Sequence, residues 1–434
     1  MRDGNRMDEA LNIAGGQIAM APVIVSSALS GVTDDLISLA DHAVTGESET
    51  VSQILDTLEK RHFDGLAGLS GVESSAERIK NLFSELRALL RGLSLLKECS
   101  PRTHDAVLAF GELLSTTVLH ARALSAGYDA FLLDSRDLIY TDANFTAASP
   151  DFKKTNAAVQ KILKPKSGKI YITQGFIGRA PNGATSTLGR GGSDFTATIL
   201  GAALGADEVQ IWTDVNGIMT SDPRVVTGAR TVESLSYEEA AELAYFGAKV
   251  VHPSTIQPAI DKNIPVLVKN TLDPSGPYTG ITGETTGSGI RAIAGKKKIT
   301  LVNVTSSRML NAYGFLNRIF SVFEQHETPV DLIATSEVSV SITIEDDAHL
   351  DSIAEELGGV GTVNVEHGRA IICLVGKNLW KDSSFIAEVF NSLKKIPVRM
   401  ISLGSSDINL SLVVADSDVD EAIRILHNHF FSAG

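Results

Sequence analysis

A short stretch rich in glycine and charge, residues 187–194, holds the residue types best suited to binding a small charged molecule. It reads Thr-Leu-Gly-Arg-Gly-Gly-Ser-Asp, and a run of small residues that predicts a helix follows at 195–206. The first N–H groups of such a helix and its positive dipole end attract anions. Arg190 can hold a carboxylate through two parallel N–H bonds, and Asp194 can hold an ammonium. The loop therefore suits an amino acid or a phosphate donor, although an ordinary strand-to-helix connection can also be rich in glycine.

Short apolar runs alternate with helical stretches between residues 21 and 268, and these elements must position the loop. The predicted strands are 22–27, 170–174, 209–213 and 266–269, and two clear helices are 103–126 and 237–245. The alternation predicts parallel strands with helices on both faces. Ligands of such sheets bind at the carboxyl ends of the strands. The loops at Ser27, Gly175, Arg190 and Asp214 all follow predicted strands, so we expect the functional residues at one edge.

A change of composition separates this region from the rest of the chain. Residues 271–298 are rich in Pro, Gly, Ser and Thr, which predicts a linker, and Lys296-Lys297-Lys298 is interpreted as its solvated end. An internal repeat follows, because residues 330–347 echo residues 398–416. A predicted helix precedes each copy (314–326 and 384–395), and another follows it. The order strand–helix–strand–strand–helix thus occurs twice, and the last strand of the second copy is expected from elsewhere in the pair.

Bulk properties exclude several classes of protein. A chain of 434 residues is long enough for two or three domains. Its net charge of −14, with no large basic block, argues against nucleic acid as a partner. We expect no membrane-spanning helix, because the apolar runs look too short, and the N-terminus has no signal-peptide pattern. We therefore expect a cytoplasmic enzyme with no membrane partner.

Other segments arranged around the glycine loop carry a family resemblance. They are 23–34 (Val-Ile-Val-Ser-Ser-Ala-Leu-Ser-Gly-Val-Thr-Asp), Gly111-Glu112, 212–218 (Trp-Thr-Asp-Val-Asn-Gly-Ile), 221–224 (Ser-Asp-Pro-Arg) and 246–253 (Phe-Gly-Ala-Lys-Val-Val-His-Pro). In this order they resemble aspartate kinase, which uses ATP to phosphorylate the side-chain carboxylate of L-aspartate. The resemblance implies an α/β protein with the three-layer amino-acid-kinase fold and a mainly parallel sheet. The repeat then resembles two C-terminal ferredoxin-like ACT domains, with domain bounds of 1–290, 297–368 and 369–434.

The resemblance also assigns the residues that would bind aspartate. Transfer of a phosphoryl group to a carboxylate needs positioning and charge stabilisation more than covalent help. Glu112 and Asp194 would hold the α-ammonium, and Arg190 the α-carboxylate. Ser27, Thr33 and Ser193 would line the same pocket. The simpler alternatives are a solvated charge near a helix start for Glu112 and helix caps for Ser27 and Thr33.

A second group of residues would bind ATP. Thr213 and Asp214 would meet adenine and ribose, Arg224 the polyphosphate, and Lys249 the terminal phosphates. Lys249, Arg190 and Asp194 are the predicted catalytic residues, although Lys249 and Arg224 could also be ordinary surface charges. The family often has Tyr at the position of Met219, so adenine stacking stays open there. Mg²⁺ is expected to bind mainly through ATP, and no protein residue is assigned to a metal.

The first repeat resembles the lysine-inhibited class of aspartate kinases. The residues that match its effector pocket are Met309, Phe315, Leu316, Val330, Asp331, Ser336 and Glu337. Asp331 and Glu337 could meet the cationic groups of L-lysine, and helix-start N–H groups near Gly314 its carboxylate. Core packing is the alternative for the apolar members. The ACT pair is expected to form a homodimer or a higher homo-oligomer, in which the effector biases a two-state equilibrium.

One family feature is missing from residues 1–20. Aspartate kinases begin with a strand that ends in Lys-Phe-Gly-Gly-Thr-Ser, and nothing here matches it. Either the start is an internal Met of a longer gene product, or the chain is a homologue that has lost a central strand and a charge. Loss of a central strand would expose the ladder groups of its neighbours, which favours the first explanation. We expect the 434-residue chain to be a weak kinase.

Three classes of function follow from these patterns. The favoured one is an aspartate kinase under lysine feedback, at the first step of lysine, threonine and methionine biosynthesis. A second is another kinase of the same fold, such as glutamate 5-kinase or acetylglutamate kinase, but the ACT repeat and the segment around Lys249 argue against it. The third is a catalytically impaired homologue that acts as an amino-acid-binding regulatory subunit.

Overall fold

The chain divides into two compact units. The structure is a computed structural model that describes residues 3–247, 251–285, 287–309, 313–404 and 407–431. The first unit comprises Met1–Asp214 and Val251–Gly276, and the second comprises Val215–Val250 and Pro277–Gly434. The chain therefore leaves the first unit after Asp214, returns to it at Val251, and leaves it again after Gly276. The predicted domain bounds stay predictions.

A parallel three-stranded sheet with strand order β1-β3-β2 lies at the centre of the first unit. Its strands are β1 (Val23–Ser26), β2 (Ala130–Leu133) and β3 (Ile170–Gln174). Because side chains alternate along a strand, Ile170 and Ile172 pack into one hydrophobic core and Tyr171 into another on the opposite face. The sheet is thus the middle of three layers, as predicted.

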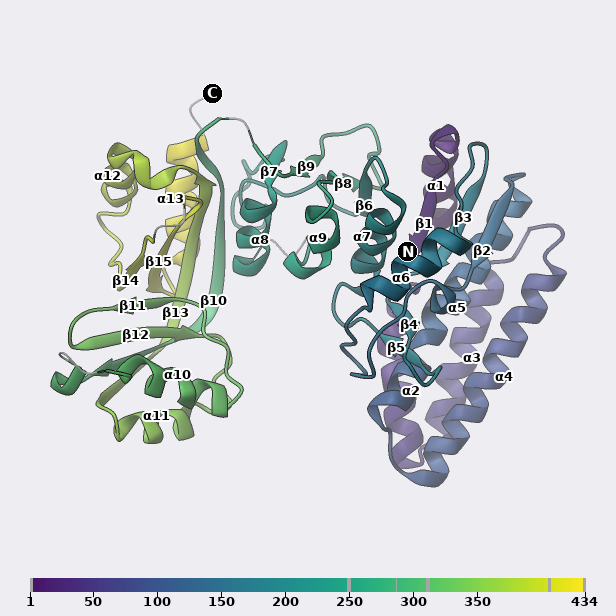
Figure 1. Ribbon diagram of the computed structural model, residues 1–434, viewed down its shortest axis with the longest axis horizontal. Helices are drawn as coiled ribbons and strands as arrows, with labels where there is room; N and C mark the ends of the chain where they lie inside the picture. The colour runs from purple at the N-terminus through teal and green to yellow at the C-terminus, as the bar shows by residue number, and fades with distance from the viewer. Residues whose placement is uncertain (1–2, 248–250, 286, 310–312, 405–406, 432–434) are drawn as a thin grey trace. The chain divides into compact units, whose positions relative to one another are not determined.

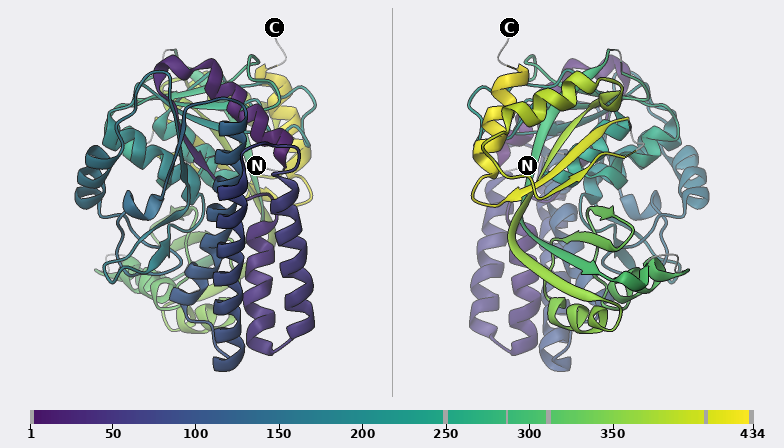
Figure 2. Two further views of the ribbon diagram at one scale, coloured as in Figure 1. Left: turned by 90° about the vertical axis from the view of Figure 1, so that its right-hand side faces the viewer. Right: turned by 90° about the vertical axis from the view of Figure 1, so that its left-hand side faces the viewer.

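Helices cover both faces of this sheet. One core contains residues of α1 to α5, and the other contains residues of α6 and α7. Helices α2 to α5 lie alongside one another (Figure 1, Figure 2). The bounds are α1 (Gly4–Gly16), α2 (Val32–Thr45), α3 (Ser48–Asp64), α4 (Glu73–Leu96), α5 (Pro101–Ser125), α6 (Phe152–Ile162) and α7 (Gly192–Leu204).

Further strands complete the first unit. A short antiparallel hairpin, β4 (Ile177–Arg179) with β5 (Thr185–Thr187), leads into the glycine loop. Beyond α7, β6 (Val209–Thr213) pairs in parallel with β8 (Val266–Asn270), and α9 (Pro253–Ile260) packs against α7. The predicted strands at 170–174 and 209–213 therefore have exactly the observed bounds.

Helix α5 is the most deeply buried helix that approaches the pocket described below. Ser100 accepts a hydrogen bond from the N–H of Thr103, and Pro101 occupies the first turn, so the sequence sets this helix start. By length and composition α5 could cross a membrane, which corrects the prediction that no apolar run was long enough. The most apolar part of α5 is 83% buried within the protein, as in a core helix.

Gly111 allows α5 to approach the loop after β1. A Cβ atom at this position would lie 2.8 Å from the Cβ of Ala28 and 3.3 Å from a methyl group of Leu36. We therefore expect Gly111→Val to lower the free energy of unfolding by about 1–3 kcal/mol through overpacking, measured by urea denaturation. The control is Gly92→Ala in α4, where a new Cβ meets nothing within 4 Å and removal of a helical glycine should stabilise. Equal stability of the two variants would contradict this packing.

One antiparallel sheet with order β11-β12-β10-β13-β15-β14 dominates the second unit. Its two long central strands, β10 and β13, pair with each other along most of their length, and each also pairs with one strand of a repeat. The first half of β10 is therefore the strand that the second repeat borrows. The strand bounds are β10 (Gly289–Thr305), β11 (Ile333–Thr335), β12 (Ser339–Ile344), β13 (Thr362–Lys377), β14 (Met400–Ser402) and β15 (Asn409–Ala415).

Two pairs of helices accompany the halves of this sheet. Helices α10 and α11 share one core with β10 and β12, and α12 and α13 share another with β13 and β15. Figure 1 labels these helices and strands. Their bounds are α10 (Phe315–Gln325), α11 (Leu350–Gly358), α12 (Ser383–Ser392) and α13 (Val419–Phe431). The same unit contains β7 (Ser234–Ser236) paired in parallel with β9 (Thr279–Thr282), and α8 (Tyr237–Phe246) between them in sequence. The predicted pair of ferredoxin-like modules is present.

The lysine run at 296–298 belongs to a strand rather than a linker, and Lys297 and Lys298 are exposed to solvent while Lys296 is not. The strand is β10, and Lys296 bonds Asp331 at 2.7 Å and Glu345 at 3.0 Å with only 14% of its side chain exposed. The prediction failed because a run of charges carries no information about distant carboxylates that can neutralise it. Part of the expected linker at 271–298 is likewise strand, in β9 and β10.

Candidate active site

A pocket of about 310 Å³ lies where the glycine loop meets two strand ends of the first unit. Its lining residues come from the loops after β1 and β3, from α2 and α5, and from the start of α7. They are Ser27, Thr33, Glu112, Phe176, Gly189, Gly191, Gly192, Ser193 and Asp194. The structure thus brings together most of the residues predicted to bind aspartate.

Glu112 places a buried carboxyl group in this pocket. Its side chain belongs to α5, and the residue is only 3% exposed. One oxygen accepts a hydrogen bond from the N–H of Ala28 at 3.1 Å, while the other has no hydrogen-bond partner among the described residues. Burial raises the pKa of Glu112 to about 7. Glu112 is therefore not the solvated surface charge of the alternative interpretation.

Asp194 supplies a second buried carboxyl group from the first turn of α7. Burial raises its pKa to about 6. Neither carboxyl group forms an ion pair with a described residue, and both line one pocket. Two such groups favour a cation, because an ammonium would offset part of their negative charge and supply up to three hydrogen bonds.

Hydroxyl groups connect the elements around these carboxyl groups. The Ser27 hydroxyl donates to the Ser193 hydroxyl at 2.9 Å, which joins the loop after β1 to the start of α7. The Ser115 hydroxyl of α5 donates to the carbonyl of Ser27 at 2.8 Å. Thr33 lies in the first turn of α2, whose N-cap is Gly31, so neither Ser27 nor Thr33 is the N-cap of that helix.

Arg190 lies on the glycine loop, but its side chain is exposed and does not line the pocket. Its neighbours Gly189 and Gly191 have positive φ angles of 74° and 70°, which glycine adopts without strain. The backbone of the loop can therefore come close to a ligand, while the guanidinium of Arg190 stands outside the pocket in this conformation.

Phe176 is a pocket residue that sequence reasoning missed. It has a left-handed φ of 67°, and its N–H donates to the Thr196 hydroxyl of α7 at 3.1 Å. The preceding Gly175 leaves room for the start of α7, because a Cβ there would collide with Ser193. The only signal in the sequence was that Gly175 directly follows a predicted strand.

The residues predicted to bind ATP occupy both units. Thr213 ends β6 and Asp214 follows it, and the Thr213 hydroxyl donates to Asp214 at 3.2 Å. Met219 and Arg224 belong to the second unit, where the guanidinium of Arg224 pairs with Asp222 at 2.7 Å and is 88% exposed. Lys249 lies outside the described residues.

The predicted effector residues all belong to the second unit. Phe315 lies in the core beneath α10, and Met309 and Val330 pack against that core, whereas Leu316 is exposed. Ser336 bonds the hydroxyl of Ser339, and Glu337 is exposed. Among the polar members, Asp331 has a charged partner. Its carboxylate accepts hydrogen bonds from the ammonium of Lys296 at 2.7 Å and from the hydroxyl of Tyr245 at 2.6 Å.

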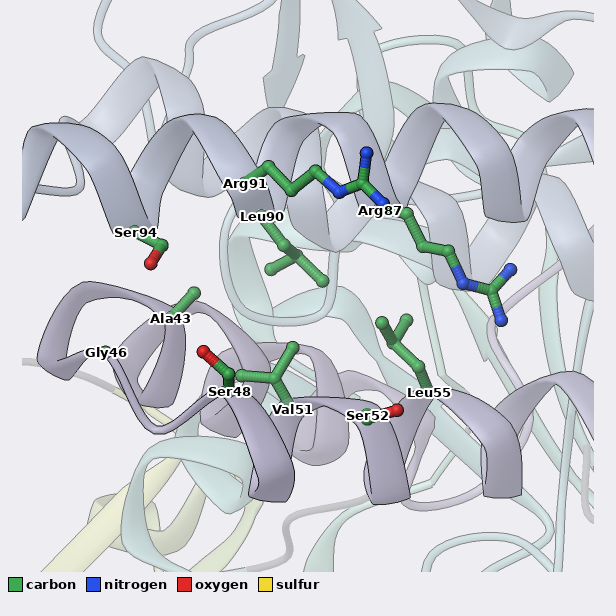
Figure 3. A pocket seen from close by; sticks show the side chains of 10 residues that line it. All are labelled: Ala43, Gly46, Ser48, Val51, Ser52, Leu55, Arg87, Leu90, Arg91 and Ser94. Atoms are coloured by element: carbon green, nitrogen blue, oxygen red, sulfur yellow. The ribbon is translucent and has the colours of Figure 1, made fainter.

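A second cavity, of about 340 Å³, lies among α2, α3 and α4 (Figure 3). Arg87 and Arg91 of α4 line it together with Ser48, Ser52 and apolar side chains of α3. Arg87 already pairs with Glu59 at 2.5 Å. No carboxylate lines this cavity, so it does not offer the pair of acidic groups found in the first pocket.

The three-layer fold and the acidic pocket at the glycine loop define an amino acid kinase. The family model of that name, the amino acid kinase family, matches residues 7–270, and an ACT domain model matches residues 372–430. Aspartokinase 2, chloroplastic, of Arabidopsis thaliana is 37% identical over 453 residues, covering 99% of this chain and 82% of that protein. Lysine-sensitive aspartokinase 3 of Escherichia coli is 37% identical over 420 residues, covering 94% and 92%.

Solved structures give the same result. The crystal structure of E. coli aspartokinase III in complex with aspartate and ADP has a TM-score of 0.85 and 35% identity, with 99% of this chain and 97% of that chain covered. The complex of the same enzyme with lysine and aspartate has a TM-score of 0.80, 36% identity and coverage of 97% and 96%. The chain belongs to the aspartokinase family and is a kinase.

Proposed function

We propose that this kinase transfers the γ-phosphoryl group of ATP to the side-chain carboxylate of L-aspartate and forms 4-phospho-L-aspartate. The observation that carries the proposal is the pair of buried carboxyl groups, Glu112 and Asp194, in one pocket. They would bind the α-ammonium. Arg190 would bind the α-carboxylate once its side chain turns inward, and the Ser27 and Ser193 hydroxyls would contact the substrate.

The chemistry asked of these residues is mainly positioning. With the ammonium held by Glu112 and Asp194, the side-chain carboxylate can point out of the pocket, and one of its oxygens attacks the γ-phosphorus in line as ADP departs. Thr213, Asp214, Met219, Arg224 and Lys249 are proposed to bind ATP. A relative was solved with aspartate and ADP, which supports both ligands.

Magnesium is proposed to bind through the phosphates of ATP. Among the residues that the structure describes, no group of three or more His, Cys, Asp or Glu side chains could hold a metal ion alone. Mg²⁺ keeps several waters and takes few protein ligands when it binds with a nucleotide, so the ATP phosphates would supply most of its ligands other than water. When bound, Mg²⁺ would neutralise charge on the transferring phosphates.

We further propose that L-lysine inhibits the enzyme through the second unit, and that the reaction is the first step of lysine, threonine and methionine biosynthesis. One relative is named lysine-sensitive, and a solved relative contains lysine. Pairing of ACT sheets would give a homodimer or a higher homo-oligomer. We place the enzyme in the cytoplasm, with a plastid as the alternative because Arabidopsis relatives are named chloroplastic.

An ADP-release assay with aspartate, homoserine, glutamate and acetylglutamate tests this function. Aspartate alone should support turnover. Turnover with glutamate or acetylglutamate would favour the other kinases of this fold. ATP turnover with none of the four would favour the non-catalytic regulatory subunit, which the matches to aspartokinases along nearly the whole chain do not support.

The pocket also predicts how aspartate binding depends on pH. The pKa values of Glu112 and Asp194 are raised to about 7 and about 6, so protons compete with the substrate ammonium below these values. The KM for aspartate should therefore rise as the pH falls from 8 to 6. Once the pH lies well below the pKa of a group, that group should raise KM by roughly tenfold for each further pH unit. In calorimetry near pH 6.5, aspartate binding should release protons. A KM that is flat between pH 6 and 8 would contradict an ammonium site built from these groups.

A further inference from the structure

Asp105 is a fully buried carboxylate with no part in the site described so far. It lies on α5 seven residues before Glu112, which corresponds to about two helical turns, so the two side chains share one face of the helix. Its exposure is 0%. No ion pair joins it to a basic side chain among the described residues, and its hydrogen-bond partners are backbone N–H groups and one hydroxyl.

The donors come from two segments that are distant in sequence. Thr187, at the end of β5, donates its N–H at 2.8 Å and its hydroxyl at 2.9 Å. The N–H of Thr146 lies 3.0 and 3.1 Å from the two carboxylate oxygens. Thr146 has a φ of 74°, a left-handed conformation that is unfavourable for a β-branched residue. The carboxylate therefore holds this backbone in a geometry that it would not adopt alone.

Thr187 is the first residue of the glycine loop, and the Thr146 segment lies against this loop. Thr187 precedes Gly189, the first loop residue that lines the pocket, by two positions. The carbonyl of Thr187 accepts a hydrogen bond from Ala148 at 2.9 Å. A Cβ on Gly189 would lie 3.3 Å from the carbonyl oxygen of Thr146, so the Thr146 segment packs against the loop. A shift at Asp105 would therefore move the base of the loop.

We propose that Asp105 is a positioning residue that fixes the loop from Gly189 to Asp194 over the aspartate pocket. One face of α5 would then carry two functional residues. Glu112 would bind the substrate, and Asp105 would anchor the loop that carries Asp194. This inference rests on the proposed function for its kinetic effect. Its structural part, the ordering of the loop, is independent of the substrate.

The test is Asp105→Asn, which keeps the shape of the side chain but exchanges one acceptor oxygen for a donor. At least one of the three donors then loses its partner. We expect the KM for aspartate to rise roughly tenfold to a hundredfold, with a smaller change in kcat, because a displaced loop misplaces Asp194. Thr187→Val, which removes only the hydroxyl donor, should cause a smaller rise, and it keeps the proposal testable if Asp105→Asn does not fold. If both act through the same contact, the double variant should be no worse than Asp105→Asn alone.

The matched control is Thr155→Val in α6. The Thr155 hydroxyl is also fully buried and has two hydrogen bonds to the backbone of Tyr140, at 3.0 and 3.2 Å, so neither bond reaches the glycine loop. A merely structural role of Asp105 would lower the melting temperature in both variants and leave both aspartate KM values unchanged, which would overturn the proposal.

Hydrogen exchange of the amides from 187 to 194 separates this proposal from the proposed function. We expect faster exchange there in Asp105→Asn and Thr187→Val, but not in Thr155→Val. If the wild type did not phosphorylate aspartate, the proposed function would fail, while faster exchange would still support the anchoring role. Unchanged exchange in Asp105→Asn would reject that role whatever the substrate.

Discussion

Replacing Glu112 by Gln is expected to lower kcat/KM for aspartate by about a hundredfold and to make the folded protein more stable at pH 8. The activity falls because a hydrogen bond between charged groups contributes about 1.5–3 kcal/mol, and the neutral amide cannot neutralise the substrate ammonium. The hydrogen bond from Ala28 can be kept, since the amide oxygen still accepts.

The stability gain follows from the sign of the pKa shift. Burial raises the pKa of Glu112 from 4.5 to about 7, so the folded state binds more protons than the unfolded state between these values. Stability therefore falls as the pH rises through this window, and above pH 7 the ionised side chain costs about 1–3 kcal/mol. The Gln variant avoids this cost. Melting curves at pH 5 and pH 8 should differ between variant and wild type mainly at pH 8.

Asp194→Asn should behave in the same way, for the same reason. Its matched control is Asp207→Asn, which removes the same charge from an exposed residue just beyond the other end of α7. Asp207→Asn should change neither kcat/KM nor stability appreciably. Wild-type turnover in either Glu112→Gln or Asp194→Asn would show that the acidic pair does not bind the substrate.

Asp331→Asn is expected to weaken lysine inhibition by roughly tenfold or more in the half-inhibitory concentration, with little change in turnover without lysine. The Asp331 side chain is only 4% exposed, and its carboxylate already accepts hydrogen bonds from the ammonium of Lys296 and the hydroxyl of Tyr245. A lysine effector that uses the same carboxylate would exchange an internal ammonium for an external one. Loss of a charged acceptor would cost such binding about 1.5–3 kcal/mol.

The contact with Tyr245 lies close in the sequence to a residue predicted to bind ATP. Tyr245 lies in α8, which ends at Phe246, three positions before the predicted catalytic Lys249. Glu345→Gln is the control, since Glu345 also pairs with Lys296 but is 66% exposed. Lysine inhibition that survives Asp331→Asn and fails in Glu345→Gln would place the effector elsewhere.

The parts that could be predicted from the sequence were those encoded locally. Apolar runs predicted the strands at 170–174 and 209–213 exactly, because both runs are bounded by polar or glycine-containing segments. Motif order predicted the pocket residues Glu112, Ser193 and Asp194. The repeat predicted the paired modules, and the borrowed strand proved to be the first half of β10.

The parts that could not be predicted depend on contacts between distant segments. Asp105 looks like any polar residue in an apolar helix until Thr146 and Thr187 are brought to it. Lys296 is indistinguishable from a solvated lysine until folding places Asp331 beside it. Arg190 matched its motif, yet its side chain stands outside the pocket, because side-chain orientation on an exposed turn is not encoded by residue type.

Trapping of the product with hydroxylamine tests the central claim most directly. An acyl phosphate reacts with hydroxylamine to give a hydroxamate, and its position shows which carboxylate received the phosphoryl group. With aspartate and MgATP, the enzyme should yield the side-chain hydroxamate in step with ADP release, and Glu112→Gln should slow both equally. An α-hydroxamate would show that the substrate binds in the opposite orientation. ADP release without any hydroxamate would contradict an aspartate kinase.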